Sequence, residues 1–279
     1  MDVRWFRRLT IVGGLLGMLI VGLGIGEGPV QAQEAATIPP EIISYWKLDE
    51  TSGSFFADAV GTSPAVCVTS SSCPNPLTGT VGKAQNFARN TGLMVAHNAR
   101  FDFANADSFT IEAWVKLDVT SCEQPKVFVG KYSSGASWWL GCSRTSAGDV
   151  ATFSGRDSSG VSFVVQGTQS LTDGKWHHVV GRRNGTTTTF RVFVDGVQQD
   201  SLFSTFSGSI SNSNPLTIGY YQSPFAYQHY GAIDEIAIWH VALEHATIRD
   251  HYNKGLAGKG YIDVDERLTM HAYIPLIFK

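Results

Sequence analysis

Hydrophobic and polar residues alternate along several short stretches of the chain. In residues 109–117, every second position from Phe109 to Leu117 is apolar, and Thr110, Glu112, Trp114 and Lys116 stand between them. A period of two residues places successive side chains on opposite faces of a β-strand. The pattern recurs at residues 175–182, 189–195 and 232–241. Turn-forming pairs such as Asp173-Gly174 and Asp195-Gly196 separate the stretches, so the sequence predicts an all-β sandwich of two antiparallel sheets.

One helix is expected near the end of this pattern. Ile248 and Tyr252 lie four positions apart, and Gly255 follows where it would end a helix that spans about residues 243–254. Large rings inside strands usually fill the interior of a sandwich. On that basis four tryptophans are interpreted as core residues: Trp46, Trp114, Trp176 and Trp239.

The first 32 residues have the features of a signal peptide. Three arginines, Arg4, Arg7 and Arg8, precede an uncharged run at residues 9–26, and Val30-Gln31-Ala32 resembles a cleavage site. We therefore expect cleavage after Ala32, secretion, and no stable membrane span afterwards. The alternative is an uncleaved membrane anchor, because the run is just long enough to be considered.

Composition narrows the class of protein further. The 279 residues carry 21 Lys and Arg against 24 Asp and Glu, only 16% of residues are charged, and the pI is about 6.2. A nucleic-acid-binding domain normally has a basic stripe and a much higher pI, so no nucleic-acid partner is expected. The low charge and 29 glycines also argue against coiled coils and disordered acidic tails.

Four cysteines remain after the predicted cleavage, and an exported chain with an even number normally forms disulfides. The cysteines are Cys67, Cys73, Cys122 and Cys142, and three pairings are open. The local pairing, 67 with 73 and 122 with 142, is favoured because each pair flanks a short loop or turn. Zinc binding is disfavoured because no C-x-x-C spacing occurs.

Six segments, in order, carry a resemblance to a known family. They are GKAQNF (82–87), SFTIEAWVKL (108–117), DGKWHHVV (173–180), FRVFVDGV (190–197), LTIG (216–219) and GAIDEIAIW (231–239). The chain thereby resembles secreted bacterial forms of laminin-G-like domains in the concanavalin A-like lectin/glucanase superfamily. The resemblance implies a jelly-roll sandwich at residues 44–256 with one short C-terminal helix, preceded by a linker (33–43) and followed by a tail (257–279).

Catalytic motifs are missing from the sequence, although the superfamily includes glucanases. Their active strand carries acids at alternating positions, and no E-x-D-x-E pattern occurs here. In a regular strand the neighbours His177 and His178, like Asp234 and Glu235, would point to opposite faces and could not act as a pair. We therefore expect no enzyme activity.

Calcium is the cofactor that the resemblance implies. Similar domains hold one Ca²⁺ near the sheet rim with oxygen ligands, and the matching positions here are Asp58 and Asp234, with Asp49 as a third candidate. The segment after Phe87 departs from the family pattern, because Arg89 stands near the position of a short acidic residue. The alternative is that Asp234 caps local structure without a metal.

Residues 220–230 form the most informative predicted loop, because they concentrate aromatic rings and amides. The candidate ligand-binding residues are Tyr220, Tyr221, Phe225, Tyr227 and Tyr230, with Trp138 of the Trp138-Trp139 pair as a second patch. Aromatic rings stack on sugar faces and amides bind hydroxyl groups. The alternative is that these rings only pack the loop against the sandwich.

Together these features predict a secreted, non-catalytic recognition module that binds extracellular or cell-surface carbohydrate. The alternative is a structural or adhesive domain that binds an extracellular protein, and a glycoside hydrolase comes third. The apolar end of the tail, residues 273–279, has two interpretations: retention of the protein at the cell surface, or a last strand of the sandwich.

Overall fold

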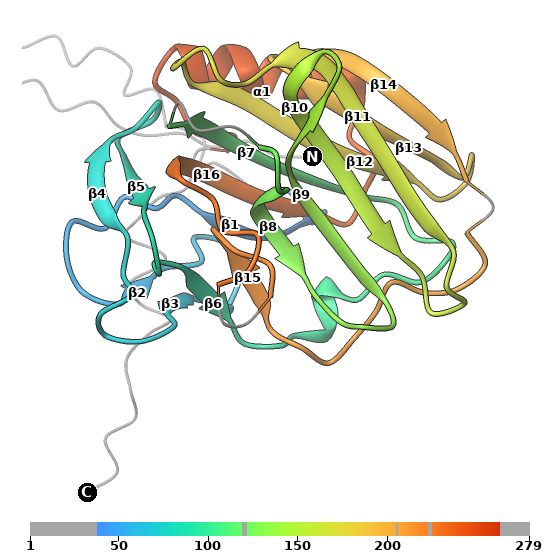
Figure 1. Cartoon of the computed structure of the whole chain (residues 1–279), viewed down its shortest axis with the longest axis horizontal. Helices are drawn as coiled ribbons and strands as arrows, with labels where there is room; N and C mark the ends of the chain where they lie inside the picture. Colours follow the sequence, from blue (N-terminus) through green and yellow to red (C-terminus); the bar gives the residue numbers. More distant parts are fainter. Residues whose placement is uncertain (1–37, 119–121, 205, 223–224, 263–279) are drawn as a thin grey trace, which may run out of the picture. The chain divides into compact units, whose positions relative to one another are not determined.

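The computed structural model describes residues 38–118, 122–204, 206–222 and 225–262. The predicted signal peptide and the tail segment 263–279 lie outside these residues. Two antiparallel sheets of eight strands each face one another across a common core (Figure 1). The prediction of a two-sheet antiparallel jelly-roll sandwich with one helix near its C-terminal end is confirmed.

The strands of each sheet come from distant parts of the chain. Sheet A has the order β14 (Val197–Phe203), β13 (Thr189–Val194), β12 (His177–Asn184), β7 (Phe109–Leu117), β16 (Gly231–Trp239), β5 (Lys83–Phe87) and β4 (Asn75–Thr78), and β1 (Ile42–Trp46) also pairs with β16. Sheet B has the order β11 (Ser162–Ser170), β10 (Gly148–Arg156), β9 (Ser137–Thr145), β8 (Lys126–Lys131), β15 (Leu216–Ile218), β6 (Leu93–Val95), β3 (Ala65–Cys67) and β2 (Phe55–Phe56). A short 3-10 turn, η1 (Ala99–Phe101), precedes β7.

The core between the sheets follows the predicted alternation. All five apolar residues at alternate positions of β7, from Phe109 to Leu117, belong to this buried cluster. Phe103 stacks on Phe109 with 4.1 Å between ring centroids, and Trp138 and Trp46 lie in the same interior. Each large apolar side chain buried here contributes about 2 kcal/mol, so this interior is the main source of stability.

A second apolar cluster covers the outer face of sheet A, the face turned away from the core. The helix α1 (His245–Leu256) packs there and supplies Ile248 (Figure 1). Trp114 and Trp239 belong to this second cluster. Both rings are buried as predicted, but beneath the helix rather than between the sheets.

The helix begins and ends two residues later than predicted. Gly255 lies inside the helix and does not end it; the cap is Ala257, and Gly258 follows with a φ of +70°. The reason for glycine at position 255 is close packing, because a Cβ there would lie 2.4 Å from Cζ2 of Trp114. The described chain continues past the predicted domain end at residue 256, and Tyr261 is buried against the second cluster.

Both disulfides have the predicted local pairing. Cys67 at the end of β3 is bonded to Cys73, and Cys122 is bonded to Cys142 of β9. The second bond ties the start of the β8 segment to its neighbouring strand. No helix among the described residues is long and apolar enough to cross a membrane.

Candidate functional site

The predicted aromatic loop is held against sheet B by backbone hydrogen bonds. After β15, the amide of Tyr221 donates to the carbonyl of Ala226 at 3.1 Å, and the amide of Ala226 donates back to Gln222 at 2.7 Å. The amide of Val127 in β8 donates to the carbonyl of Tyr227 at 2.9 Å. The loop is therefore folded back on itself, and its returning arm is joined to β8.

The loop buries some of its rings and exposes others. Tyr220 and Tyr221 are buried, Phe225 and Tyr230 are half-buried, and Tyr227 is 40% exposed. Tyr220 packs against Phe225, in the space left by a glycine at position 92, where a Cβ would lie 2.5 Å from the Tyr220 ring. Burial raises the pKa of Tyr220 to about 12. Tyr220 thus packs the loop, whereas Tyr227 presents its ring to solvent.

The two adjacent tryptophans of β9 point to opposite sides of sheet B. Trp138 is fully buried in the core, so its ring has no surface for a ligand. The prediction that Trp138 binds a ligand is therefore wrong. Trp139 is the outward member and is half-buried. The sequence could predict that one tryptophan faces out, but not which one, because β9 has apolar residues on both faces at this point.

Trp139 belongs to a group of four rings on the outer face of sheet B. Tyr221 is its centre, with ring centroids 5.1 Å from Tyr132, 6.2 Å from Trp139 and 6.4 Å from Tyr227. We call Tyr132, Trp139, Tyr221 and Tyr227 the aromatic cluster. Gly130 makes room for it, because a Cβ there would lie 2.8 Å from the Tyr221 ring.

Polar side chains continue this face across the next strands. The amide of Gln166 on β11 donates to Ser143 Oγ on β9 at 2.8 Å, and Ser143 is 2.5 Å from Thr152 Oγ1 on β10. We call these three residues the polar row. Inward residues such as Phe153 and Leu140 alternate with them, so the polar row and Trp139 occupy the same outward face. Rings beside hydroxyl and amide groups can stack on a sugar and bind its hydroxyls.

The acids expected to bind calcium lie in two places. Asp49 Oδ1 accepts the amide of Lys83 at 2.6 Å, and Asp234 Oδ2 accepts the amides of Thr80 and Val81 at 2.8 and 3.0 Å. Both carboxylates therefore contact the turn between β4 and β5. Asp234 Oδ1 is buried without a hydrogen bond, and burial raises the pKa of Asp234 to about 8 despite the two amides.

Asp58 has a different environment. Its carboxylate accepts Ser44 Oγ at 2.8 Å and the amide of Tyr45 at 2.9 Å, together with the amides of three residues in its own turn, Val60, Gly61 and Ser63. Such a donor set fits a structural carboxylate and leaves no lone pairs for a cation. Among the described residues, no three His, Cys, Asp or Glu side chains are grouped so as to hold a metal ion.

Asp234 and Glu235 share one face of sheet A, contrary to the expectation of opposite faces. Ile233 and Ile236, three positions apart, both point into the core, because a β-bulge interrupts the register between residues 234 and 237 and Glu235 has a φ of +52°. The hydroxyl of Tyr45 donates to Glu235. Burial, followed by the charge of Asp234, raises the pKa of Glu235 well above its usual value. Sequence alternation alone gives no sign of this bulge.

Glu112 forms a buried polar network beneath the helix that the sequence did not indicate. Its carboxylate accepts the indole of Trp239 at 2.5 Å, lies 3.1 Å from His178 Nε2, and also contacts His251. Burial would raise the Glu112 pKa, but the charge of His251 and the hydrogen bonds of both imidazoles outweigh it and lower that pKa to about 2. His177 points away, as predicted, and bonds Asp195 and Asp173.

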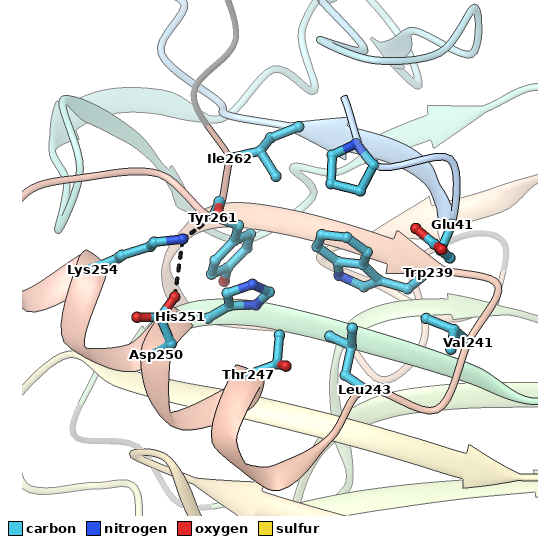
Figure 2. A pocket seen from close by; sticks show the side chains of 11 residues that line it. Glu41, Trp239, Val241, Leu243, Thr247, Asp250, His251, Lys254, Tyr261 and Ile262 are labelled. Carbon is cyan, nitrogen blue, oxygen red and sulfur yellow. Dashed lines mark hydrogen bonds and ion pairs between the residues drawn. The ribbon is translucent and has the colours of Figure 1, made fainter. Parts of the chain in front are cut away.

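His251 also borders a cavity of about 340 Å³ between α1, β16 and the end of the described domain (Figure 2). Trp239, Leu243 and Ile262 form much of its apolar wall, and Lys254 bridges Asp250 at 3.0 Å and the carbonyl of Tyr261 at 3.3 Å. The imidazole ring of His251 is stacked on Trp239. Thr247 also lines this cavity, and the hydrogen bonds of His251 run to Glu112.

A laminin G-type family model, described as the concanavalin A-like lectin/glucanases superfamily, matches residues 88–249. This match covers more than half of the chain. The chain belongs to this superfamily. The resemblance expected from the six sequence segments is therefore confirmed.

Solved structures with the same fold include several binding domains. The binding domain of Paraclostridial Mosquitocidal Protein 1 superposes with a TM-score of 0.62 and 14% identity, over 77% of this chain and 52% of that one. Domain 4 of AbnA, an extracellular arabinanase from Geobacillus stearothermophilus, was solved in complex with arabinotriose. It superposes with a TM-score of 0.56 and 18% identity, over 75% of this chain and 97% of that one. The binding domain of botulinum neurotoxin serotype G superposes with a TM-score of 0.58 and 13% identity, over 76% of this chain and 50% of that one.

The chain thus spans about half the length of the two toxin domains and nearly the whole arabinanase domain. At these identities the likeness concerns the fold alone. No curated protein matches the sequence significantly.

Proposed function

We propose that this chain is a secreted, non-catalytic module that binds carbohydrate on the outer face of sheet B. The observation that carries the proposal is the aromatic cluster with the polar row beside it. Trp139 and Tyr227 supply accessible rings, and Ser143 and Gln166 supply hydroxyl and amide groups within the same face. The arabinanase domain of the same fold, solved with a bound oligosaccharide, supports this ligand class.

The outer face of sheet B suits a large ligand better than that of sheet A. Helix α1 covers part of the outer face of sheet A, whereas the exposed side chain of Val164 and the half-buried rings of Tyr132 and Trp139 lie open on sheet B. An extended sugar chain could therefore contact several strands at once. The two disulfides are typical of the extracellular setting in which such ligands occur.

A glycan-array screen tests this function. The purified protein should retain one class of oligosaccharide, and the double variant Trp139→Ala, Tyr227→Ala should lose that retention at unchanged thermal stability. Phe203→Ala is the matched control, because this ring is 68% exposed on β14, at the edge of sheet A. A blank array for the unaltered protein, or equal loss in the control, would contradict carbohydrate binding on this face.

A protein ligand is the alternative, and the edge strand β14 favours it. This strand lies at the edge of sheet A, and its residues Val197 and Phe203 are 60% and 68% exposed. Unpaired edge strands with apolar side chains are common sites of association with other chains. In that case Phe203→Ala would weaken binding of an extracellular protein, and the double variant on sheet B would not.

Calcium is proposed as a structural ion with a reduced ligand set. Asp49 and Asp234 converge on the turn between β4 and β5, so these two carboxylates would hold the ion with backbone carbonyls and water as further ligands. Asp58 would not take part. The array is therefore run with calcium and with a chelator, and calcium-dependent retention that Asp234→Asn removes would support this site.

A further inference from the structure

Two arginines stand directly opposite each other on neighbouring strands of sheet A. Arg182 on β12 is the register partner of Arg191 on β13. Val180 and Phe193, each two positions away along its strand, belong to the cluster on the outer face. The arginine side chains therefore share that outer face, where like charges on opposed residues repel each other.

Within the described part of the chain, no carboxylate forms an ion pair with either arginine. Among the described residues, neither arginine has a carboxylate within the 4.0 Å of an ion pair. Arg182 is only 4% exposed, and its Nε and Nη1 atoms make no hydrogen bond; Nε of Arg191 is also buried without one. Buried donors without a hydrogen bond cost free energy. A bound anion would remove this cost by accepting hydrogen bonds from both arginines.

The amino end of α1 is held beside the same arginines. Thr110, which is the register partner of Arg182 on β7, donates to the carbonyl of Val241 at 2.8 Å and accepts the amide of Leu243 at 3.0 Å. The helix starts two residues later at His245, whose ring lies 5.0 Å from Phe193. Burial and then the charges of Arg182 and Arg191 lower the pKa of His245.

The first turn of this helix has free amide donors. Glu244 at the N-cap makes no side-chain cap hydrogen bond, and its side chain is exposed. The amino end of a helix attracts anions because its amides point outward and its dipole is positive there. Glu244 is the acid that acts on Arg182 from this side, and its charge opposes a bound anion.

We propose that Arg182, Arg191 and the amino end of α1 form a binding site for a tetrahedral oxyanion, the sulfate or phosphate ester of an anionic polysaccharide. Guanidinium groups bind such oxygens with paired hydrogen bonds, and the helix amides add further donors. The site lies on the outer face of sheet A, on the opposite side of the sandwich from the aromatic cluster. It would let the protein recognise charged groups independently of any neutral sugar bound on sheet B.

Calorimetric titration with inorganic sulfate, inorganic phosphate and a heparin tetrasaccharide tests the site. We expect the intact protein to bind these probes, and Arg191→Gln to weaken binding about tenfold or more, as expected when a charge-assisted pair of hydrogen bonds is lost. Glu244→Gln should strengthen binding about two- to fivefold, because a repelling charge is removed. Arg89→Gln, at an exposed arginine outside sheet A's outer face, is the matched control and should bind as the intact protein does.

Three results would overturn the site: no heat with any probe, equal loss in Arg89→Gln and Arg191→Gln, or unchanged binding in Arg191→Gln. Arg191→Lys covers the case in which Arg191→Gln does not fold, because it keeps the charge and should show an intermediate loss. Sulfate and phosphate contain no sugar, so this outcome does not depend on the array result. The desulfated tetrasaccharide separates recognition of the ester from recognition of the sugar backbone.

Discussion

His251 Nδ1 on α1 lies 3.0 Å from Glu112 Oε1 on β7, in the interior beneath the helix. The same carboxylate contacts His178 on β12 and Trp239 on β16. One buried acid therefore joins the helix to three neighbouring strands of sheet A. This contact makes the position of α1 sensitive to the charge at residue 112.

Replacing Glu112 with Gln should lower the free energy of unfolding by about 3 kcal/mol, because two buried imidazoles and an indole lose a charged acceptor. Urea unfolding at neutral pH measures this loss. The pH dependence of this contribution follows from the pKa of Glu112, which falls from 4.5 to about 2 on folding. The stabilisation by Glu112 is thus present above pH 4.5 and lost as the pH falls towards about 2. Equal stability of the two proteins at neutral pH would contradict this role.

Asp234 should produce the opposite pH trend. Burial raises its pKa from 3.8 to about 8, so the folded state holds a proton that the unfolded state releases. Stability therefore falls as the pH rises from about 4 to about 8. In a chelator, Asp234→Asn should flatten this decline, which urea unfolding from pH 5 to pH 9 would measure.

Calcium gives that experiment a second arm. If Asp234 holds the ion, added calcium should restore the stability of the unaltered protein at high pH and leave Asp234→Asn unchanged. The exposed Asp200 on β14 supplies the control variant, Asp200→Asn, which should follow the unaltered protein. Parallel curves for all three proteins would contradict the assignment of the trend to Asp234.

Gly255→Ala should destabilise the protein although alanine is the better helix former. In an open helix this change would stabilise by about 1 kcal/mol. Here the new Cβ would lie 2.4 Å from Trp114 Cζ2, and overpacking of this kind costs about 1–3 kcal/mol. A fall in the thermal midpoint checks the prediction. Gly167→Ala, whose Cβ would meet its nearest atoms at 3.4 Å, should change that midpoint little.

The two disulfides should differ in their contributions. Loss of Cys122–Cys142, with 20 residues of separation, should cost about 3 kcal/mol, and loss of Cys67–Cys73, with a separation of 6, about 2 kcal/mol in the chain-entropy description. Double serine variants, compared in guanidinium unfolding, measure the two values. A larger loss from the shorter loop would show that local packing, and not loop closure, governs both bonds.

Strand alternation predicted the core well because it depends only on local geometry. The alternate apolar positions of β7 from Phe109 to Leu117 all point inward as expected. The outer face of sheet A was harder to predict, since Trp114 and Trp239 become buried only when α1 packs over them. A tryptophan in a strand has the same sequence signature whether a sheet or a helix covers it.

The candidate site was predicted in part, and its errors have physical causes. The loop that carries Tyr221 and Tyr227 was identified by composition, but their partners Tyr132 and Trp139 come from other strands and meet only through sheet pairing. Adjacent residues 234 and 235 share a face because of a single bulge. Long-range register and local irregularity of this kind leave no periodic trace in the sequence.

The pairing of β1 with β16 brings both ends of the described domain to one place. Pro39 and Ile262 line the same cavity, on the α1 side of sheet A. The aromatic cluster lies on the far side of the sandwich from this junction. Both ends of the described domain therefore leave the outer face of sheet B unobstructed, so a fusion at either end is expected to keep the aromatic cluster accessible.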